Sequence, residues 1–220
     1  MPPWVWRWRE WRAKHDWQRA LLGGVREQWR TPVNQARLMV FDLEMTGLDA
    51  QQDQLLAIGM VPIIDGCILP GRGKHVYVQI DGSVGQSAVI HKIHDNQLEQ
   101  ALSPEQAFDW WCKQMAGFVP VAHHGGLDFG FLRVTAQRQT GQDFKMPWVD
   151  TLVLEQRRLT MREQTIKPGD LTLSACRQRY RLPQYQAHHA LSDAFATAEL
   201  LLAQLAQMGG SDKIEVGSLL

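Results

Sequence analysis

The chain has 220 residues, which suits one domain of ordinary size with an added element. Hydrophobic residues make up 45% and charged residues 21%, so we expect a packed, soluble core. No apolar run approaches the roughly 18 residues needed to cross a bilayer, and no signal peptide is recognisable. The three cysteines are widely separated and fit the free thiols of a reducing compartment. These features exclude a membrane-spanning protein and predict a cytoplasmic one.

The net charge is zero, but the charges are unevenly distributed. Residues 1–38 contain eight Lys or Arg and three Asp or Glu, whereas residues 39–220 contain fifteen and twenty. The larger part of the chain is therefore acidic, and an acidic domain is a poor general binder of polyanions. If this part acts on nucleic acid, cations must offset some of its carboxylates.

The first half of the chain predicts a helix followed by a strand meander. Residues 4–30 have helical periodicity, with Trp4, Trp8 and Trp11 on one face. Proline and glycine positions and apolar runs then delimit three strands, the last with a glycine-rich interruption, at 37–41, 55–64 and 67–80.

The second half predicts alternating helices and strands. The strands are expected at 119–122 and 148–149, and the helices at 103–116, 127–138, from 150 onward, at 171–180 and at 191–207. A meander followed by this alternation predicts an α/β fold with a mixed sheet. We divide the chain into a Trp- and Arg-rich helical extension, a main domain and a loose tail, at 1–35, 36–208 and 209–220.

One pair of acids lies at the end of the first predicted strand. Side chains alternate along a strand, so Asp42 and Glu44 point to the same side. Two adjacent carboxylates repel each other and need a dication or a proton between them. Taken alone, however, the pattern is better explained by acids exposed to water at a strand end.

Two further acids begin predicted helices. Asp128 follows the buried strand at 119–122, where ligands commonly bind α/β sheets. Asp193 begins the last helix, and His188 lies in the loop before it. The alternative for both acids is stabilisation of a helix N-terminus. Asp150, at another strand end, is predicted to be an N-cap rather than a ligand.

Together these segments resemble the DEDDh exonucleases, in particular those of the epsilon proofreading type. The motif D-x-E-x-T-G lies over residues 42–47, H-N-x-x-F-D-x-x-F-L over 123–132 and H-x-A-x-x-D over 188–193. His124 stands where the family usually has Asn, and Leu127 where it usually has Phe. An epsilon-like H-x-I pattern begins at His91. The resemblance covers about residues 38–206.

The resemblance implies a ribonuclease H-like exonuclease fold, with a mixed five-stranded sheet flanked by helices. It implies a 3′–5′ exonuclease that releases nucleoside 5′-monophosphates, by a two-metal mechanism with His188 as general base. Two Mg²⁺ or Mn²⁺ ions would be bound by Asp42, Glu44, Asp128 and Asp193. Substrate contacts are expected from Met45, Thr46, Gly47, Leu48, His91, His124 and Phe131. Single-stranded DNA or a 3′ end is the favoured substrate.

Several alternatives stay open at this point. The first motif also resembles that of oligoribonuclease, so short RNA is an alternative substrate, and a non-catalytic interaction module is another alternative. The tryptophans and arginines of residues 1–35 could clamp a single strand, cover the main domain or form a homodimer interface, and we favour packing. A membrane-surface role for this helix is disfavoured by its acids. Whether a polymerase binds the chain is not decided by the sequence.

Overall fold

The computed structural model describes residues 5, 10–11, 13–83, 93, 98, 100–186 and 188–220. In this part of the chain one mixed sheet contains β1 (Arg37–Met45), β2 (Leu55–Ile64), β3 (Cys67–Ile68), β4 (Lys74–Tyr77), β5 (Val119–Ala122) and β6 (Val149–Asp150). The order is β3-β2-β1-β5-β6, with β2 antiparallel to β1, and β5 and β6 parallel. β3 and β4 both pair with β2, because the 3-10 helix Pro70–Arg72 splits the third predicted strand. The six strands thus fill five positions, as expected.

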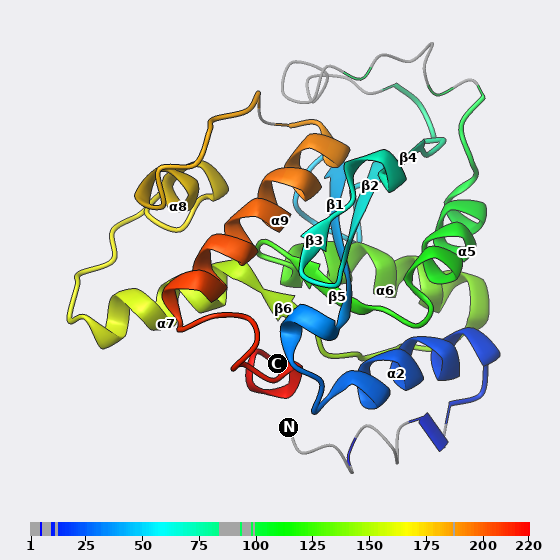
Figure 1. The fold of residues 1–220 in the computed structure, drawn as a ribbon. Coiled ribbons are helices and arrows are strands. Elements are labelled where there is room, and N and C mark those ends of the chain that lie inside the picture. Colours follow the sequence, from blue (N-terminus) through cyan, green and yellow to red (C-terminus); the bar gives the residue numbers. More distant parts are fainter. Residues whose placement is uncertain are drawn as a thin grey trace.

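Alternation along β1 supplies two cores, one on each face of the sheet. Met39 and Phe41 join the core that α2 (Asp16–Gln28), α5 (Pro104–Met115) and α6 (Gly126–Thr140) cover. Leu38 and Val40 join the opposite core, under α7 (Thr151–Met161) and α9 (Ala190–Gln207). Figure 1 shows α9 crossing the sheet diagonally, with α8 (Leu173–Arg179) beside it. None of the described helices is long and apolar enough to cross a membrane.

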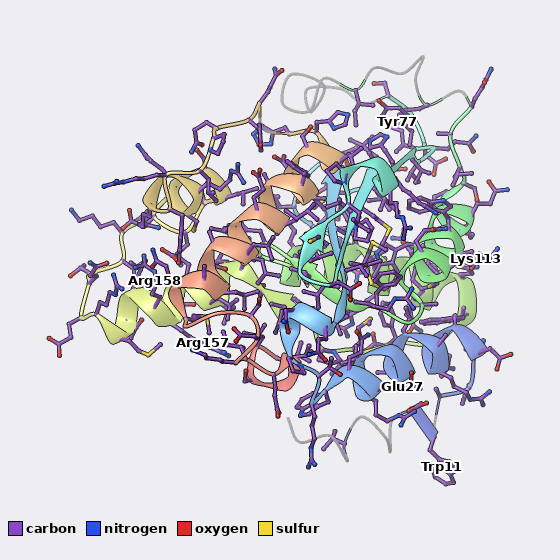
Figure 2. All side chains as sticks on the ribbon, viewed as in Figure 1. Trp11, Glu27, Tyr77, Lys113, Arg157 and Arg158 are labelled. Atoms are coloured by element: carbon purple, nitrogen blue, oxygen red, sulfur yellow. The ribbon has the colours of Figure 1, made fainter. Side chains whose placement is uncertain are left out.

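The N-terminal region is not one continuous helix over 4–30. The chain leaves helical geometry at residues 13–15, before α2 begins. Trp4 and Trp8 lie outside the described residues. Trp11 is 79% exposed, and Figure 2 shows it projecting away from the body of the protein. Of the predicted tryptophan face, Trp11 therefore makes no buried contact with the main domain.

Helix α2 packs through the aliphatic residues in its middle and through Trp17, whose ring lies edge-on to Phe108 and Phe144. Leu21 and Val25 are almost fully buried and belong to the core of the main domain. Gly24 lets the helix approach the turn after α5, since a Cβ at this position would lie 2.8 Å from Cα of Gly117. The prediction that the N-terminal extension packs against the main domain therefore holds for α2.

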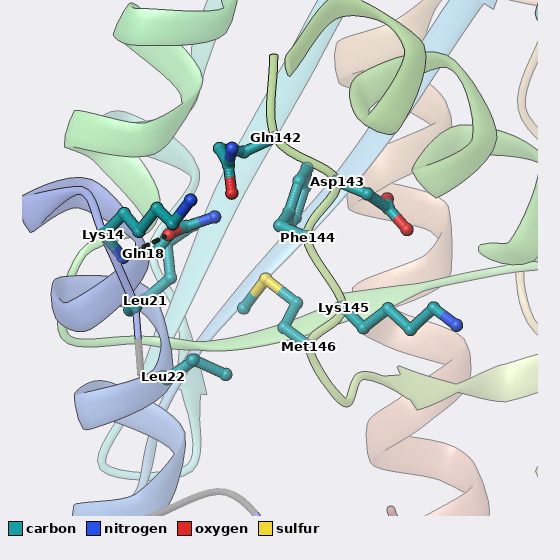
Figure 3. Close-up of a pocket in the computed structure, with 10 residues that line it drawn as sticks. Lys14, Gln18, Leu21, Leu22, Gln142, Asp143, Phe144, Lys145 and Met146 are labelled. Atoms are coloured by element: carbon teal, nitrogen blue, oxygen red, sulfur yellow. Dashed lines mark hydrogen bonds between the residues drawn. The ribbon is translucent and has the colours of Figure 1, made fainter. Parts of the chain in front are cut away.

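A hollow of about 360 Å³ remains where α2 meets the segment 142–146. Figure 3 shows Leu21 and Leu22 on α2 facing Phe144 and Met146 across it. The hollow lies on the α2 side of the molecule and is lined by none of the predicted catalytic acids.

Residues 209–220, expected to form a loose tail, pack against the main domain. Val216 and Leu219 are buried in the core beneath α9. The backbone N–H of Val216 donates to the carbonyl of Thr31 at 3.1 Å. The four aliphatic side chains of this short stretch, Ile214, Val216, Leu219 and Leu220, do not form a recognisable helical or strand period, so only their tertiary contacts show that the segment is packed.

Candidate active site

Three of the four predicted metal ligands lie together at the carboxyl end of β1. Asp42 and Glu44 lie on the same face of the strand, and Asp193 lies in the first turn of α9. One carboxylate oxygen of each residue lies within 4.8 Å of those of the other two. The fold therefore brings together acids that are far apart in the sequence.

A glycine on the neighbouring strand makes this approach sterically feasible. Gly59 of β2 pairs with Asp42, and a Cβ on Gly59 would lie 2.2 Å from the carbonyl carbon of Ala190. Any other residue would push away the helix that carries Asp193. Sequence analysis missed Gly59, although a glycine inside an apolar strand is a known sign of close backbone approach.

The fourth acid, Asp128, lies beside the three-acid cluster rather than within it. Asp128 is buried in the first turn of α6, and its Oδ1 accepts a hydrogen bond from the N–H of Leu43 at 3.1 Å. Leu43 lies between Asp42 and Glu44 in the strand, so this bond fixes α6 to the acidic strand end. The charge of Asp128 also raises the pKa of both neighbouring acids.

Burial is the largest cause of a raised pKa at all four acids. It raises the pKa of Glu44 to about 8, with further contributions from Asp193 and Asp128. Burial raises the pKa of Asp128 to about 7, although hydrogen bonds from backbone N–H groups oppose the shift. The pKa of Asp42 lies well above its ordinary value, through burial and then through its three acidic neighbours. Such a cluster retains protons at neutral pH unless a cation replaces them.

His188 lies at the entrance to this cluster. The residue is exposed and has a φ of +69°, in the left-handed region. Its backbone N–H donates to Oδ2 of Asp193 at 2.7 Å. His188, Asp42, Glu44 and Asp193 line a common hollow of about 360 Å³. An imidazole thus faces a space bordered by carboxylates.

Two polar neighbours of the site have structural roles. His189 is the N-cap of α9, and its ring stacks on that of His75 at a centroid distance of 5.0 Å. Asp150 accepts a hydrogen bond from the N–H of Leu152 at 3.0 Å and caps α7, as predicted. It also accepts a hydrogen bond from the N–H of His124, at 3.0 Å.

Two of the predicted substrate contacts, His124 and Phe131, lie in the second motif. Phe131 is only 3% exposed and packs in the core between the sheet and α6, so its assignment to substrate binding is corrected. His124 is exposed and has a φ of +64°. Asn and His are both enriched in this left-handed conformation, which explains why His can replace the usual Asn here. His91 lies outside the described residues.

The remaining predicted contacts form the turn after β1. The hydroxyl of Thr46 accepts a hydrogen bond from the N–H of Gln54 at 2.9 Å. A Cβ on Gly47 would overlap the carboxylate of Asp53, so a larger residue here would displace that side chain. Met45 is partly buried, whereas Leu48 is 78% exposed. The turn is therefore built by Thr46 and Gly47 and presents Leu48 to solvent.

Sequence analysis did not anticipate one wall of the hollow. This wall consists of Thr172, Leu173, Ser174, Arg177, Gln184 and Tyr185. It is tied to β5 by His123, whose Nε2 donates to the carbonyl of Leu171 at 2.9 Å. Burial lowers the pKa of His123, consistent with a neutral, structural imidazole. No motif covers this part of the chain, so only the fold reveals it.

Comparison of the sequence with protein families gives one match over most of the chain. The exonuclease family model matches residues 39–201, which include all four acids and His188. The DNA polymerase III PolC-type protein of Thermotoga petrophila is 31% identical over 168 residues, which are 76% of this chain and 12% of that protein. A DNA polymerase III subunit epsilon-like protein of Rhodobacter capsulatus is 28% identical over 185 residues, 83% of this chain and 26% of that protein. The chain thus spans a small part of the length of these relatives.

Solved structures with a similar fold are also nucleases. The zinc-bound complex of E. coli ExoI with single-stranded DNA has a TM-score of 0.66 and 14% identity, covering 80% of this chain and 42% of that chain. The nuclease domain of 3′hExo, a DEDDh family member bound to rAMP, has a TM-score of 0.64 and 12% identity, covering 82% and 96%. At these identities the similarity concerns the fold, and it confirms the predicted ribonuclease H-like exonuclease architecture.

Proposed function

This chain belongs to the exonuclease family, and on that premise we propose that it is a metal-dependent 3′–5′ exonuclease acting on single-stranded DNA. The observation that carries the proposal is the convergence of Asp42, Glu44 and Asp193 beside His188. Buried acids that repel one another are costly unless they serve a ligand, and the ligand expected here is cationic.

The donor set fits hard divalent cations. Carboxylate oxygens are the ligands that Mg²⁺ and Mn²⁺ prefer, and among the described residues no Lys or Arg forms an ion pair with these four acids. Asp42, Glu44, Asp128 and Asp193 would hold two Mg²⁺ or Mn²⁺ ions. When bound, such ions lower the pKa of water and stabilise charge on the phosphate and on the leaving oxygen.

The chain itself supplies the proton acceptor. His188 would take the proton from the water that attacks the terminal phosphorus, while the bond to the 3′ oxygen of the preceding nucleotide breaks. A nucleoside 5′-monophosphate is then released. The hydrogen bond from the backbone of His188 to Asp193 supports this role, because it places the base beside a metal ligand.

DNA is favoured as the substrate by the relatives. Those most similar in sequence are named as DNA polymerase III proteins, and ExoI was solved with single-stranded DNA. The same names make a polymerase a candidate partner. The binding of rAMP by 3′hExo keeps RNA as the second candidate substrate.

The test is hydrolysis of a 5′-labelled single strand by the purified chain. We expect Mg²⁺- or Mn²⁺-dependent shortening from the 3′ end, with mononucleotide products, faster on DNA than on matched RNA. His188→Ala and excess chelator serve as controls and should each remove the activity. A higher rate on RNA of a few nucleotides would favour the oligoribonuclease-like alternative. Inactivity on every strand with either metal would refute the nuclease assignment.

A further inference from the structure

Arg177 is a charged side chain buried in the wall of the active-site hollow. It lies on α8, is 2% exposed and lines the same space as His188. Its Nη1 donates to the carbonyl of Ala196 on α9. Its Nη2 donates to Oε2 of Glu199 at 2.7 Å and to the carbonyl of Pro183 at 2.6 Å. One guanidinium therefore joins α8, α9 and the chain segment that leads to His188.

That segment, residues 182–186, runs without helix or strand and is largely exposed. Within it, the ring of Tyr185 lies against the guanidinium of Arg177, with 4.7 Å from Cζ to the ring centroid. The hydroxyl of Tyr185 donates to Oε1 of Glu199 at 3.1 Å. We call Arg177, Tyr185 and Glu199 the inner cluster. Besides this cluster, a bond between Ser174 and Gln184 also fixes the segment, through side chains that are both exposed.

Burial of a guanidinium carries a desolvation cost, which charge-assisted hydrogen bonds offset only in part. Apolar residues can often replace a buried ion pair without loss of stability. Stability alone therefore does not explain why Arg177 and Glu199 are present. The left-handed backbone of His188 adds strain of about 1–3 kcal/mol that its surroundings must maintain. A rigid anchor three residues before His188 meets that requirement.

A second cluster of the same chemistry lies away from the hollow. Arg158 of α7 donates to Glu155 at 2.6 Å, and the hydroxyl of Tyr180 donates to the same carboxylate at 2.8 Å. The guanidinium of Arg158 lies 5.4 Å from the ring centroid of Tyr180. Figure 2 shows Arg158 on the α7 side of the molecule. This outer cluster lines no part of the active-site hollow and provides an internal control.

We propose that the inner cluster positions His188 for catalysis, with Arg177 as the positioning residue. Arg177 and Glu199 hold the segment 182–186 against α8 and α9, which sets where the following histidine enters the hollow. The inference rests on the proposed exonuclease function, in which His188 accepts the proton of the attacking water. Arg177 itself touches neither the water nor the phosphate in this scheme.

A double-mutant cycle between Arg177 and His188 tests the proposal. Arg177→Met should lower kcat by about 10- to 100-fold, because misplacing a catalytic group by roughly 1 Å can cost about 100-fold. His188→Ala should lower kcat by about 10²- to 10⁴-fold. The double variant should be no slower than His188→Ala, because Arg177 acts only through the histidine. Mn²⁺ affinity should be unchanged by Arg177→Met, and Arg158→Met should leave kcat at the wild-type value.

If Arg177→Met does not fold, a milder pair of variants tests the same proposal. Tyr185→Phe removes one hydroxyl from a 41% exposed side chain and should lower kcat by about threefold to tenfold, the net effect of an ordinary hydrogen bond. Tyr180→Phe, its counterpart in the outer cluster, should not change kcat.

The outcomes separate this inference from the proposed function. Wild-type kcat in Tyr185→Phe, or losses that multiply in the double variant, would overturn the positioning role and leave the nuclease assignment intact. A wild-type protein that hydrolyses no strand would instead refute the proposed function on which the inference rests.

Discussion

Glu155 and Asp42 are both carboxylates enclosed by the fold, but their surroundings are opposite. Burial alone would raise the pKa of Glu155, yet hydrogen bonds from Arg158 and Tyr180 outweigh it and hold the pKa below its ordinary value. Asp42 has acids as its charged neighbours, and its pKa lies well above the ordinary value. The chain thus supplies arginine partners that offset the charge of Glu155.

The four acids of the active site are left without such compensation. Among the described residues, every Lys or Arg ion pair involves other carboxylates. A metal ion is therefore the natural counter-charge of the site. Glu155 is thus paired by arginines of the chain, whereas the four clustered acids have no Lys or Arg partner among the described residues and depend on a cation from outside the chain.

The largest effect should come from Asp42→Asn. Loss of one ligand removes several kcal/mol of transition-state stabilisation, so kcat should fall by about 10³-fold or more. The metal-free variant should be as stable as the wild type or more stable, because repulsion within the cluster is relieved. Mononucleotide release and thermal unfolding in chelator measure the two effects. Near wild-type turnover would contradict the role given to Asp42.

Glu155→Gln should have the reverse pattern. It leaves Arg158 and Arg179 without their shared counter-charge, and breaking a buried pair costs about 3–5 kcal/mol, reduced here because both arginines keep some exposure. We expect a loss of about 3 kcal/mol in denaturant unfolding, with kcat preserved. A fall in kcat with unchanged stability would mean that Glu155 contributes to the chemistry.

Gly24→Ala perturbs a packed region where no charge is involved. The new Cβ would meet the backbone of Gly117, so α2 must shift, at a cost of about 1–3 kcal/mol. Equilibrium unfolding should show this loss while turnover at saturating substrate is retained. Gly126→Ala, where the space for a Cβ is open, is a control for steric overlap. Equal losses in both variants would rule out overlap as the cause.

The last prediction concerns pH. The pKa of Glu44 is raised from 4.5 to about 8 and that of Asp128 from 3.8 to about 7, so the native state retains protons that the unfolded chain releases. This stabilisation is complete below about pH 4 and is lost as pH rises through 7 to 8. Metal-free protein should therefore become less stable over this range.

Bound cations displace the same protons. Mg²⁺ affinity should rise by about tenfold per pH unit for each proton displaced, up to about pH 8. Titration calorimetry in buffers of different ionisation enthalpy would count the protons released. Affinity independent of pH between 6 and 8 would show that the acids are already ionised. The matched measurement on Glu155→Gln should retain the wild-type pH dependence, since Glu155 does not line the active-site hollow.

The sequence by itself determined the order of the elements and the identity of the acids. Apolar periodicity located the main strands and helices, and strand alternation placed Asp42 and Glu44 on one side. Three short motifs in the right order then pointed to Asp128, His188 and Asp193. The placement of the elements and of Asp42 and Glu44 is confirmed because it depends on local geometry, in which side-chain direction follows from position in a strand or helix, whereas the roles of the motif residues stay predictions.

Only the tertiary structure decided which residues make the site work. Gly59 admits the start of α9, Arg177 anchors the segment before His188, and Phe131 belongs to the core. Each of these facts depends on contacts between parts of the chain that are distant in sequence. Such contacts are set by how whole elements pack, and a local pattern does not record them.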